Sequence, residues 1–474
     1  MNVITYAARG LYDDLSEKSA LVVELFLGDE IGDFNNTITA AHIFTKLGNE
    51  ILALFDHNFC SFFLLTAYCG IVFLKEIVYN IYCTMRILFF QEKTSNKSEK
   101  IFMNMNFVMP TRIVTGKDCV INNSSLFGKF GDKCIIVTGK NSAKKSGALD
   151  DVTNALKSCG IEWYLFDGIE QNPSYASCKK ASVEAINFGA KFVVGVGGGS
   201  PLDAAKAVAV LATDIDMDER TMFSAEWEKT PLPIVCIGTT AGTGSEVTPV
   251  SVITNSSGMK KSFKAISTFP SLSFGDAKYT LSLPWDFTRS TAIDALCHCV
   301  ESYFNRMAGA VSRLFAVRGV KLLCEMLEKT AVSNELSFKD REKLYCASIY
   351  GGFAISVTGT AFPHAFGYFL TENHSVAHGN ACGAYLPEFL EYNKENEKEL
   401  VDNFEKEVGI SIADLSALVI KNLPNGDVSC GVTLSERQID NLMFRYGDNA
   451  SLKKCFGYAD VKLAKKVLSK LFLK

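Results

Sequence analysis

Four of the six histidines in this 474-residue chain fall between residues 298 and 378, close to an aspartate at helical spacing. Asp294 and His298 lie four residues apart in AIDALCHCVESY, which predicts a helix with both side chains on one face. His364 and His378 follow, and one carboxylate with three imidazoles suits Fe(II) or Zn(II). A lone Asp/His pair is more often a surface hydrogen bond. The two further histidines, in a chain so poor in histidine, favour a metal site.

A glycine loop follows the short apolar run KFVVGV. It consists of Gly197, Gly198, Gly199 and Ser200. The next residues, PLDAAKAVAVLA, predict a helix with Asp203 near its start. Glycines let backbone N–H groups approach a phosphate, and the N-terminus of a helix attracts an anion. The loop matches neither the Walker A pattern nor the G-x-G-x-x-G fingerprint, so by itself it also fits an ordinary tight turn.

A second loop, TTAGTGSEVT, follows the apolar run PLPIVCIG. It includes Thr239, Thr240 and Thr243 among five hydroxyl side chains, together with two glycines. Hydroxyls and exposed amides suit a pyrophosphate or a ribose, although such a loop alone can be a surface turn. Because both loops follow neighbouring strands of the expected sheet, a dinucleotide site explains the pair better.

The elements that must position these residues alternate between strand and helix. Short apolar runs predict a buried parallel strand at 133–139 and further strands at 161–166, 191–196 and 231–238. Helical patterns lie between them, which predicts a parallel α/β sheet whose ligands bind at the carboxyl ends of the strands. Beyond Pro284 the patterns are long and helical, at 294–305, 312–327 and 340–354. We therefore expect an α/β dinucleotide-binding domain over 105–284 and a helical metal-binding domain over 285–474.

Composition narrows the function classes. The chain has 48 Lys/Arg against 52 Asp/Glu, and this weak acidity argues against nucleic acid as a partner. Fifteen cysteines without a short secreted framework indicate reduced thiols in a cytoplasmic protein.

Residues 1–104 differ from the rest of the chain. They hold 8 Lys/Arg and 12 Asp/Glu, and therefore the whole net charge of −4. Within 51–90 lies the uncharged run NFCSFFLLTAYCGIVFL, which is borderline in length for a membrane span. Three interpretations stay open: a membrane anchor, a buried helical or oligomerisation segment, and an extension outside the working protein through an upstream start codon. We favour the third.

Four motifs in order, GGGSPLDAAK, TTAGTGSEVT, DALCHCVESY and HAFGYFLTENHSVAHG, resemble the iron-containing (group III) alcohol dehydrogenases. The resemblance runs from about Asn106 to Asn393. It implies the dehydroquinate synthase-like architecture, with an α/β N-terminal dinucleotide-binding domain, an all-α C-terminal domain and the active site between them. It also implies a homodimer or a higher homo-oligomer.

The resemblance assigns roles to individual residues. The iron ligands would be Asp294, His298, His364 and His378. Gly198, Gly199 and Ser200 would hold the cofactor pyrophosphate, with Gly197 and Asp203 beside them, and Thr239, Thr240 and Thr243 would line the nicotinamide side. Lys261, in GMKKSF, and Asn172, in QNPS, match further positions of the cofactor cleft.

Two departures from the family pattern affect the chemistry. Many members carry a histidine four residues after the third ligand, where this chain has Tyr368, so the proton relay falls to Tyr368, His374 or water. NAD-using members often have an aspartate after the first strand, where this chain has Gly139 followed by Lys140. With Lys144 and Lys145 nearby, NADP is favoured over NAD.

The implied reaction is hydride transfer between a nicotinamide cofactor, NADP or NAD, and a small alcohol or aldehyde, with Fe(II) as Lewis acid. One alternative is a zinc-dependent enzyme like the glycerol dehydrogenases. Another, from a different class, is a membrane-tethered, non-catalytic protein built around residues 51–90. The sequence does not indicate the substrate.

Overall fold

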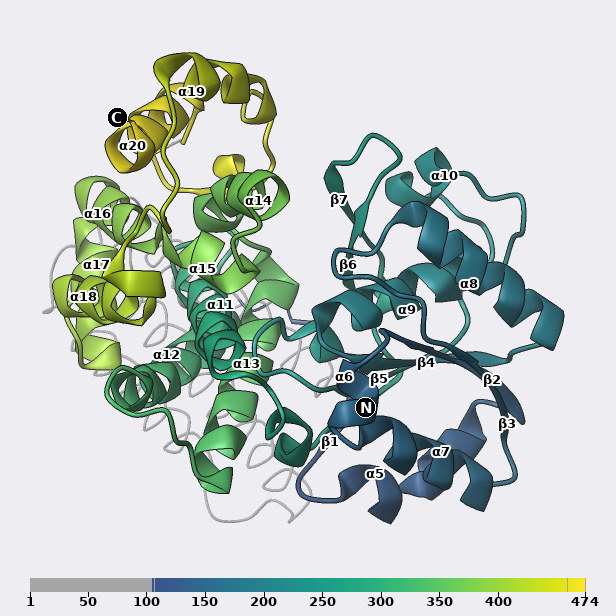
Figure 1. Cartoon of the computed structure of the whole chain (residues 1–474). Helices are drawn as coiled ribbons and strands as arrows, with labels where there is room; N and C mark the ends of the chain where they lie inside the picture. Colours follow the sequence, from purple (N-terminus) through teal and green to yellow (C-terminus); the bar gives the residue numbers. More distant parts are fainter. Residues whose placement is uncertain (1–104, 106, 458, 474) are drawn as a thin grey trace, which may run out of the picture. The chain divides into compact units, whose positions relative to one another are not determined.

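The computed structural model describes residues 105, 107–457 and 459–473, which belong to one compact unit (Figure 1). The expectations for residues 1–104, including a membrane anchor within 51–90, lie outside the described residues. Within the described ranges, none of the helices combines the length and apolarity needed to span a bilayer.

The first part of this unit is built on a parallel sheet of six strands in the order β1-β8-β5-β4-β2-β3. The strands are β1 (Arg112–Thr115), β2 (Lys133–Thr138), β3 (Glu162–Phe166), β4 (Phe192–Gly197), β5 (Ile234–Gly238) and β8 (Leu272–Gly275). All their pairings are parallel. The four strands predicted from apolar runs are present, and the predicted fold class is confirmed. A separate antiparallel hairpin, β6 (Val250–Thr254) with β7 (Lys260–Lys264), follows the loop after β5.

Helices cover both faces of the sheet (Figure 1). They are α5 (Cys119–Asn122), α6 (Ser142–Lys145), α7 (Ala148–Ser158), α8 (Tyr175–Phe188), α9 (Gly199–Leu211) and α10 (Glu219–Ser224). Successive side chains of β2 point to opposite faces, as the pleat requires. Ile135 and Val137 share a buried cluster with α8 and α9, whereas Cys134 and Ile136 share one with α7. Because both faces of β2 are buried, consecutive positions of this strand are apolar.

The second part is helical. Its helices are α11 (Trp285–Tyr303), α12 (Ala310–Thr330), α13 (Phe338–Thr358), α14 (Phe362–His374), α15 (His378–Gly383), α16 (Leu386–Asn396), α17 (Lys398–Val408), α18 (Ile412–Asn422), α19 (Glu436–Leu442) and α20 (Val461–Phe472). The helices expected at 312–327 and 340–354 lie within α12 and α13, whereas the one expected at 294–305 begins inside α11 and runs two residues past its end. Ahead of α13 the Ser337 hydroxyl accepts from the Asp340 amide, so this helix begins before its apolar pattern does.

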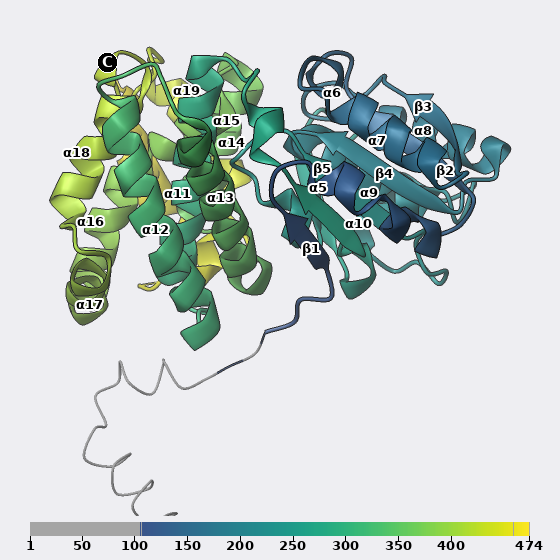
Figure 2. The ribbon, with the colours of Figure 1, turned by 90° about the horizontal axis from the view of Figure 1, so that it is seen from below.

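The helical part contacts the sheet part through α13 and the loop after β5. Figure 2 shows α13 on the side of the helical part that faces the sheet. The Tyr345 hydroxyl of α13 donates to Oε1 of Glu246 at 2.7 Å, and Glu246 lies in the one-turn helix η2 (Ser245–Val247). Gly244 has φ +60°, and a Cβ there would lie 2.6 Å from the Gly352 Cα. This close backbone approach holds the threonine-rich loop against the helical part.

Candidate metal and cofactor site

The structure brings the four predicted metal ligands together. Asp294 and His298 lie one turn apart on α11, His364 is the third residue of α14, and His378 is the first residue of α15. The Nε2 atoms of the three imidazoles lie around Asp294 Oδ1, at 3.9 Å for His298, 3.4 Å for His364 and 3.8 Å for His378. These separations are close to those between ligands of a single ion.

Close packing of α15 on α11 determines the position of His378. A Cβ on Gly379 would lie 1.7 Å from the Ser290 carbonyl oxygen of α11. Only glycine allows the two backbones to approach this closely. His378 thereby enters the site from the first turn of α15.

Two buried polar atoms in this cluster have no hydrogen-bond partner. They are Oδ1 of Asp294 and Nε2 of His364. Leaving a buried polar atom unpaired costs roughly 1–3 kcal/mol, so such atoms call for an explanation. A cation between them would satisfy both, and the donor set of one carboxylate and three imidazoles suits Fe(II) or Zn(II). The residues present therefore fit a metal ion.

Glu301 orients one of the imidazoles. Its Oε1 accepts from Nδ1 of His364 at 2.5 Å, and its Oε2 accepts from the Ala361 amide at 2.6 Å. A proton held on Nδ1 leaves the Nε2 lone pair of His364 facing the cluster. Sequence reasoning missed Glu301, although it lies seven residues after Asp294, two turns along the same face of α11.

The charge states of Asp294, His298 and His378 suit cation binding. Burial alone would raise the pKa of Asp294, but the imidazoles of His298, His378 and His364 hold it below its usual value, so the carboxylate stays ionised. Burial lowers the pKa of His378 to about 3 and also lowers that of His298. Both imidazoles are therefore neutral near pH 7, with a lone pair available to a metal. His364 differs: burial would lower its pKa, but Cys382, Glu301 and Asp294 hold its pKa well above the usual value, so a metal has to displace a proton from this imidazole.

The two predicted phosphate loops touch each other. Gly198 precedes the first turn of α9 and is not capped by a side chain, which leaves backbone N–H groups at that end. A Cβ on Gly198 would lie 3.1 Å from Thr240 Cγ2, and one on Gly199 would lie 2.7 Å from Thr243 Cγ2. The Thr239 amide donates to the Gly197 carbonyl at 2.8 Å. The uncapped N-terminus of α9 therefore lies at the carboxyl edge of the sheet, where its backbone N–H groups can bind an anion.

Asn172 and Gly139 lie around the same cradle. Asn172 adopts a left-handed backbone with φ +59°, and its amide donates to the Ser200 hydroxyl at 3.2 Å. Gly139 directly follows β2, the strand next to β4, and a Cβ there would lie 3.1 Å from the Ile169 carbonyl oxygen.

Asp203 lies near the start of α9, as expected, and its carboxylate is hydrogen-bonded within the protein. Its Oδ1 accepts from the Ser245 hydroxyl at 2.6 Å, and its Oδ2 accepts from the Val252 amide at 2.9 Å. The buried ammonium of Lys206 lies 3.7 Å from Oδ1 and donates to the Val250 carbonyl at 2.8 Å. These hydrogen bonds connect α9 to the β6–β7 hairpin. The carboxylate of Asp203 therefore stabilises the loops and does not point toward a cofactor.

The structure does not bring Lys261 to the cleft. Successive side chains on β7 alternate, and the exposed Lys261 lies over the Phe223 ring at 5.6 Å, on the far side of the hairpin. Its neighbour Lys260 lies over the Tyr368 ring at 5.4 Å, and burial lowers the pKa of Lys260. Spacing alone could not choose between two adjacent lysines, because the phase of the hairpin decides which one faces inward.

The two predicted proton-relay residues have different surroundings. The Tyr368 ring stacks on that of His378, with centroids 5.8 Å apart, and is therefore next to the metal cluster. His374 is exposed at the end of α14, where it packs on Phe369 at 5.0 Å. Sequence reasoning also missed Cys382, whose Sγ lies 3.8 Å from His378 Nε2.

Comparison with known families identifies this arrangement. The family model described as iron-containing alcohol dehydrogenase matches residues 110–277, and the model of the family's C-terminal region matches residues 288–421. The chain belongs to the iron-containing alcohol dehydrogenase family. This confirms the family suggested by the four motifs.

Known relatives agree with this assignment. The chain is 33% identical over 320 residues to the 1,3-propanediol dehydrogenase of Klebsiella pneumoniae, covering 66% of this chain and 80% of that one. It is 27% identical to the NADPH-dependent butanol dehydrogenase of Clostridium saccharobutylicum, covering 78% and 97%. The solved iron-containing alcohol dehydrogenase of Thermotoga maritima superposes with a TM-score of 0.71 at 34% identity, covering 78% and 99%. The protein is a metal-dependent alcohol/aldehyde oxidoreductase.

Proposed function

We propose that this enzyme interconverts a small alcohol and its aldehyde, with Fe(II) held by Asp294, His298, His364 and His378, and with NADP(H) as its preferred cofactor. The observation that carries the proposal is the pair of buried, unpartnered atoms, Oδ1 of Asp294 and Nε2 of His364, 3.4 Å apart beside a third and a fourth predicted ligand. Zinc is the alternative ion, since it accepts the same donors.

When bound, the metal polarises the substrate oxygen and the nicotinamide exchanges a hydride with the substrate carbon. The chain's own residues position these groups. Glu301 keeps His364 in the tautomer that presents Nε2, and the Tyr368 ring covers one side of His378. Backbone N–H groups at Gly198, Gly199 and Ser200 hold the cofactor pyrophosphate, and the hydroxyls of the second loop line the nicotinamide side.

Tyr368 keeps its proton under ordinary conditions. Burial is the main reason that its pKa is raised to about 12, so the hydroxyl is a hydrogen-bond donor rather than a base near neutral pH. His374 is exposed at the end of its helix. We therefore infer that water carries the substrate proton out of the site, with the Tyr368 hydroxyl donating a hydrogen bond along the way.

The preference for NADP(H) is supported by the segment after β2. Lys140, Lys144 and Lys145 are exposed there, and no carboxylate directly follows the strand. Lys144 pairs with Asp167 at 2.8 Å, but both side chains are about half exposed, and exposed pairs of this kind contribute little. Lys144 can therefore turn to a 2′-phosphate at low cost.

The proposal also covers the domain boundary, the oligomeric state and the cellular location. We place the boundary between the dinucleotide-binding and metal-binding domains near residue 284, between the last strand, β8, and α11. Among the described strands β1 lies at an edge of the sheet, a position where strands of two copies can pair, which supports a homo-oligomer. Every cysteine that the structure describes is a free thiol, which supports a cytoplasmic location.

The deciding experiment is a panel of small aldehydes assayed with NADPH and with NADH on protein purified without oxygen and supplied with Fe(II). Metal analysis of the same sample separates iron from zinc. The His298→Ala variant should lose both the bound metal and the activity. Full turnover by a metal-free His298→Ala protein would overturn the proposal.

A further inference from the structure

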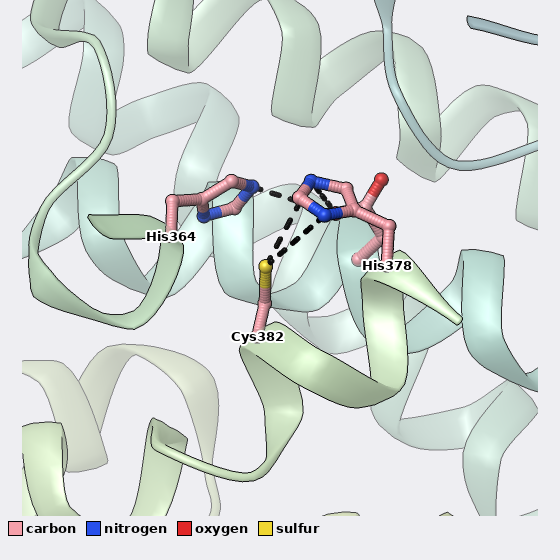
Figure 3. A group of neighbouring side chains, drawn as sticks. His364, His378 and Cys382 are labelled. Carbon is pink, nitrogen blue, oxygen red and sulfur yellow. Dashed lines mark hydrogen bonds and ion pairs between the residues drawn. The ribbon is translucent and has the colours of Figure 1, made fainter. Parts of the chain in front are cut away.

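A cysteine lies inside the metal cluster. Cys382 lies one turn after His378 on α15, is buried, and has its Sγ 3.8 Å from Nε2 and 3.9 Å from Nδ1 of that imidazole. Figure 3 shows the thiol pointing toward the imidazoles of His364 and His378. One ligand atom each from Asp294, His364, His378 and Cys382 lies within 4.8 Å of all the others.

The separations within this group are near those of a tetrahedral ion. Bond lengths of about 2.0–2.3 Å place neighbouring nitrogen, oxygen and sulfur ligands about 3.3–3.6 Å apart. The observed separations are 3.4 Å between Asp294 Oδ1 and His364 Nε2, and 3.8 Å from His378 Nε2 to both Asp294 Oδ1 and Cys382 Sγ. The sulfur therefore lies as near to His378 Nε2 as Asp294 Oδ1 does, and this separation is compatible with two ligands of one ion.

A second, independent observation points to a cation at the same place. Asp294 Oδ1 and His364 Nε2 are fully buried and have no hydrogen-bond partner, and both residues belong to the group that includes Cys382. Both side chains are less than a tenth exposed. His298 lies on the other side of this group, with its ring stacked on that of His364 at 4.6 Å and its Nδ1 3.3 Å from the Gly242 carbonyl oxygen.

We propose that Cys382 is a further ligand of the metal and binds it as a thiolate. The inference rests on the proposed metal site. When the ion enters, the thiol loses its proton to solvent and a metal–sulfur bond forms, with no change in oxidation state. A soft sulfur donor strengthens binding of thiophilic ions such as Zn(II) and Co(II) more than that of Fe(II). Cys382 therefore shifts the metal preference of this chain toward zinc.

Cobalt provides the test, because a thiolate bonded to Co(II) absorbs in the near ultraviolet by charge transfer from sulfur. Metal-free protein is loaded with one Co(II) per chain without oxygen, and its spectrum is recorded. We expect the sulfur band in the unaltered protein and in the Cys430→Ser control. The control removes a thiol of the helical part whose Sγ lies 3.9 Å from the Asn380 carbonyl oxygen. The Cys382→Ser variant should bind Co(II) without that band.

A second measurement needs no variant, so a Cys382→Ser protein that fails to fold does not end the test. X-ray absorption of the zinc-loaded, unaltered protein should include one sulfur neighbour at about 2.3 Å. One bound metal per chain with neither the charge-transfer band nor the sulfur neighbour would overturn the role of Cys382 and leave the proposed function standing. Protein that binds no metal at all would contradict the metal site, and with it the proposed function.

Discussion

Asp294 and His364 each leave one buried polar atom unpaired, while the other polar atom of His364 is held firmly. Nδ1 of His364 contacts Glu301, which also accepts from the Ala361 amide at the start of α14. A fixed imidazole with a free lone pair is prepared for a cation before the cation arrives. Glu301 is therefore a positioning residue that acts on the metal through His364.

Replacing Glu301 with glutamine tests this role. The amide keeps the size of the side chain but loses the charge that holds the Nδ1 proton, so metal affinity should fall about 10–100-fold. Competition with a chromogenic chelator measures the affinity. The control is Glu325→Gln, at an exposed carboxylate paired with Lys343. Unchanged metal affinity in the Glu301→Gln protein would show that Glu301 does not orient the ligand.

The adjacent lysines of β7 offer a matched pair. Lys260 faces Tyr368 and the metal cluster, whereas Lys261 lies over Phe223 on the far side of the hairpin. A contact with a charged group contributes about 1.5–3 kcal/mol, so Lys260→Ala should lower kcat/KM for the nicotinamide cofactor about 10–100-fold. Lys261→Ala should stay within about twofold, as surface substitutions usually do. Steady-state kinetics with NADPH decides between them, and the reverse ranking would contradict the hairpin's phase.

At the scale of elements, the site depends on how closely α15 lies against α11. The first residue of α15 is a predicted ligand, and the second, Gly379, has no room for a side chain because of the Ser290 carbonyl. Moving α15 outward would withdraw both His378 and Cys382 from the cluster. One helix contact therefore controls two candidate ligands.

A single methyl group tests that contact. Gly379→Ala forces α15 away from α11, which should destabilise the protein by about 1–3 kcal/mol and weaken metal binding together. Thermal unfolding with and without added metal measures both effects. Gly447→Ala is the control in the same part of the chain, because a Cβ there meets nothing within 4 Å. Wild-type metal affinity in Gly379→Ala would mean that α15 tolerates the shift.

At the scale of the whole described unit, the sheet part and the helical part meet through a buried polar contact. Tyr345 of α13 donates to Glu246, whose carboxylate is buried at the end of the threonine-rich loop. Burial is the main reason that the pKa of Glu246 is raised. The contact places the cofactor loop next to the helix bundle that carries the metal ligands.

Removing the hydroxyl should loosen this contact. Tyr345→Phe leaves the Glu246 carboxylate without its donor, at a cost of about 1–3 kcal/mol, so the urea midpoint of unfolding should fall. Because the loop lines the nicotinamide side, the KM for the cofactor should rise as well. Tyr350→Phe is the control on the same helix, where the ring stacks on Phe315. Equal urea midpoints for Tyr345→Phe and Tyr350→Phe would show that the Tyr345 hydroxyl does not stabilise the contact between the two parts.

The local features of this protein could be predicted from its sequence. The strands β2, β3, β4 and β5 follow from short, mostly apolar runs, and the pairing of Asp294 with His298 follows from the period of a helix. Two strands, β1 and β8, were missed because four residues carry too little pattern to separate them from a loop. The hairpin β6–β7 was missed for a related reason, since one of its faces is polar.

Tertiary structure alone decided the rest of the site. The packing of α14 and α15 on α11 brought Cys382 into the group of metal-ligating atoms and Glu301 into contact with Nδ1 of His364, although Glu301 and Cys382 lie 81 positions apart in the chain. The alternation of side chains along β7 turns Lys260, and not Lys261, toward Tyr368. The packing of α9 on the same hairpin places the Asp203 carboxylate in hydrogen bonds within the protein. Residue type and local period determine which groups can do chemistry. Packing between elements that are distant in sequence decides which of those groups come into contact. A local sequence pattern carries no information about that packing.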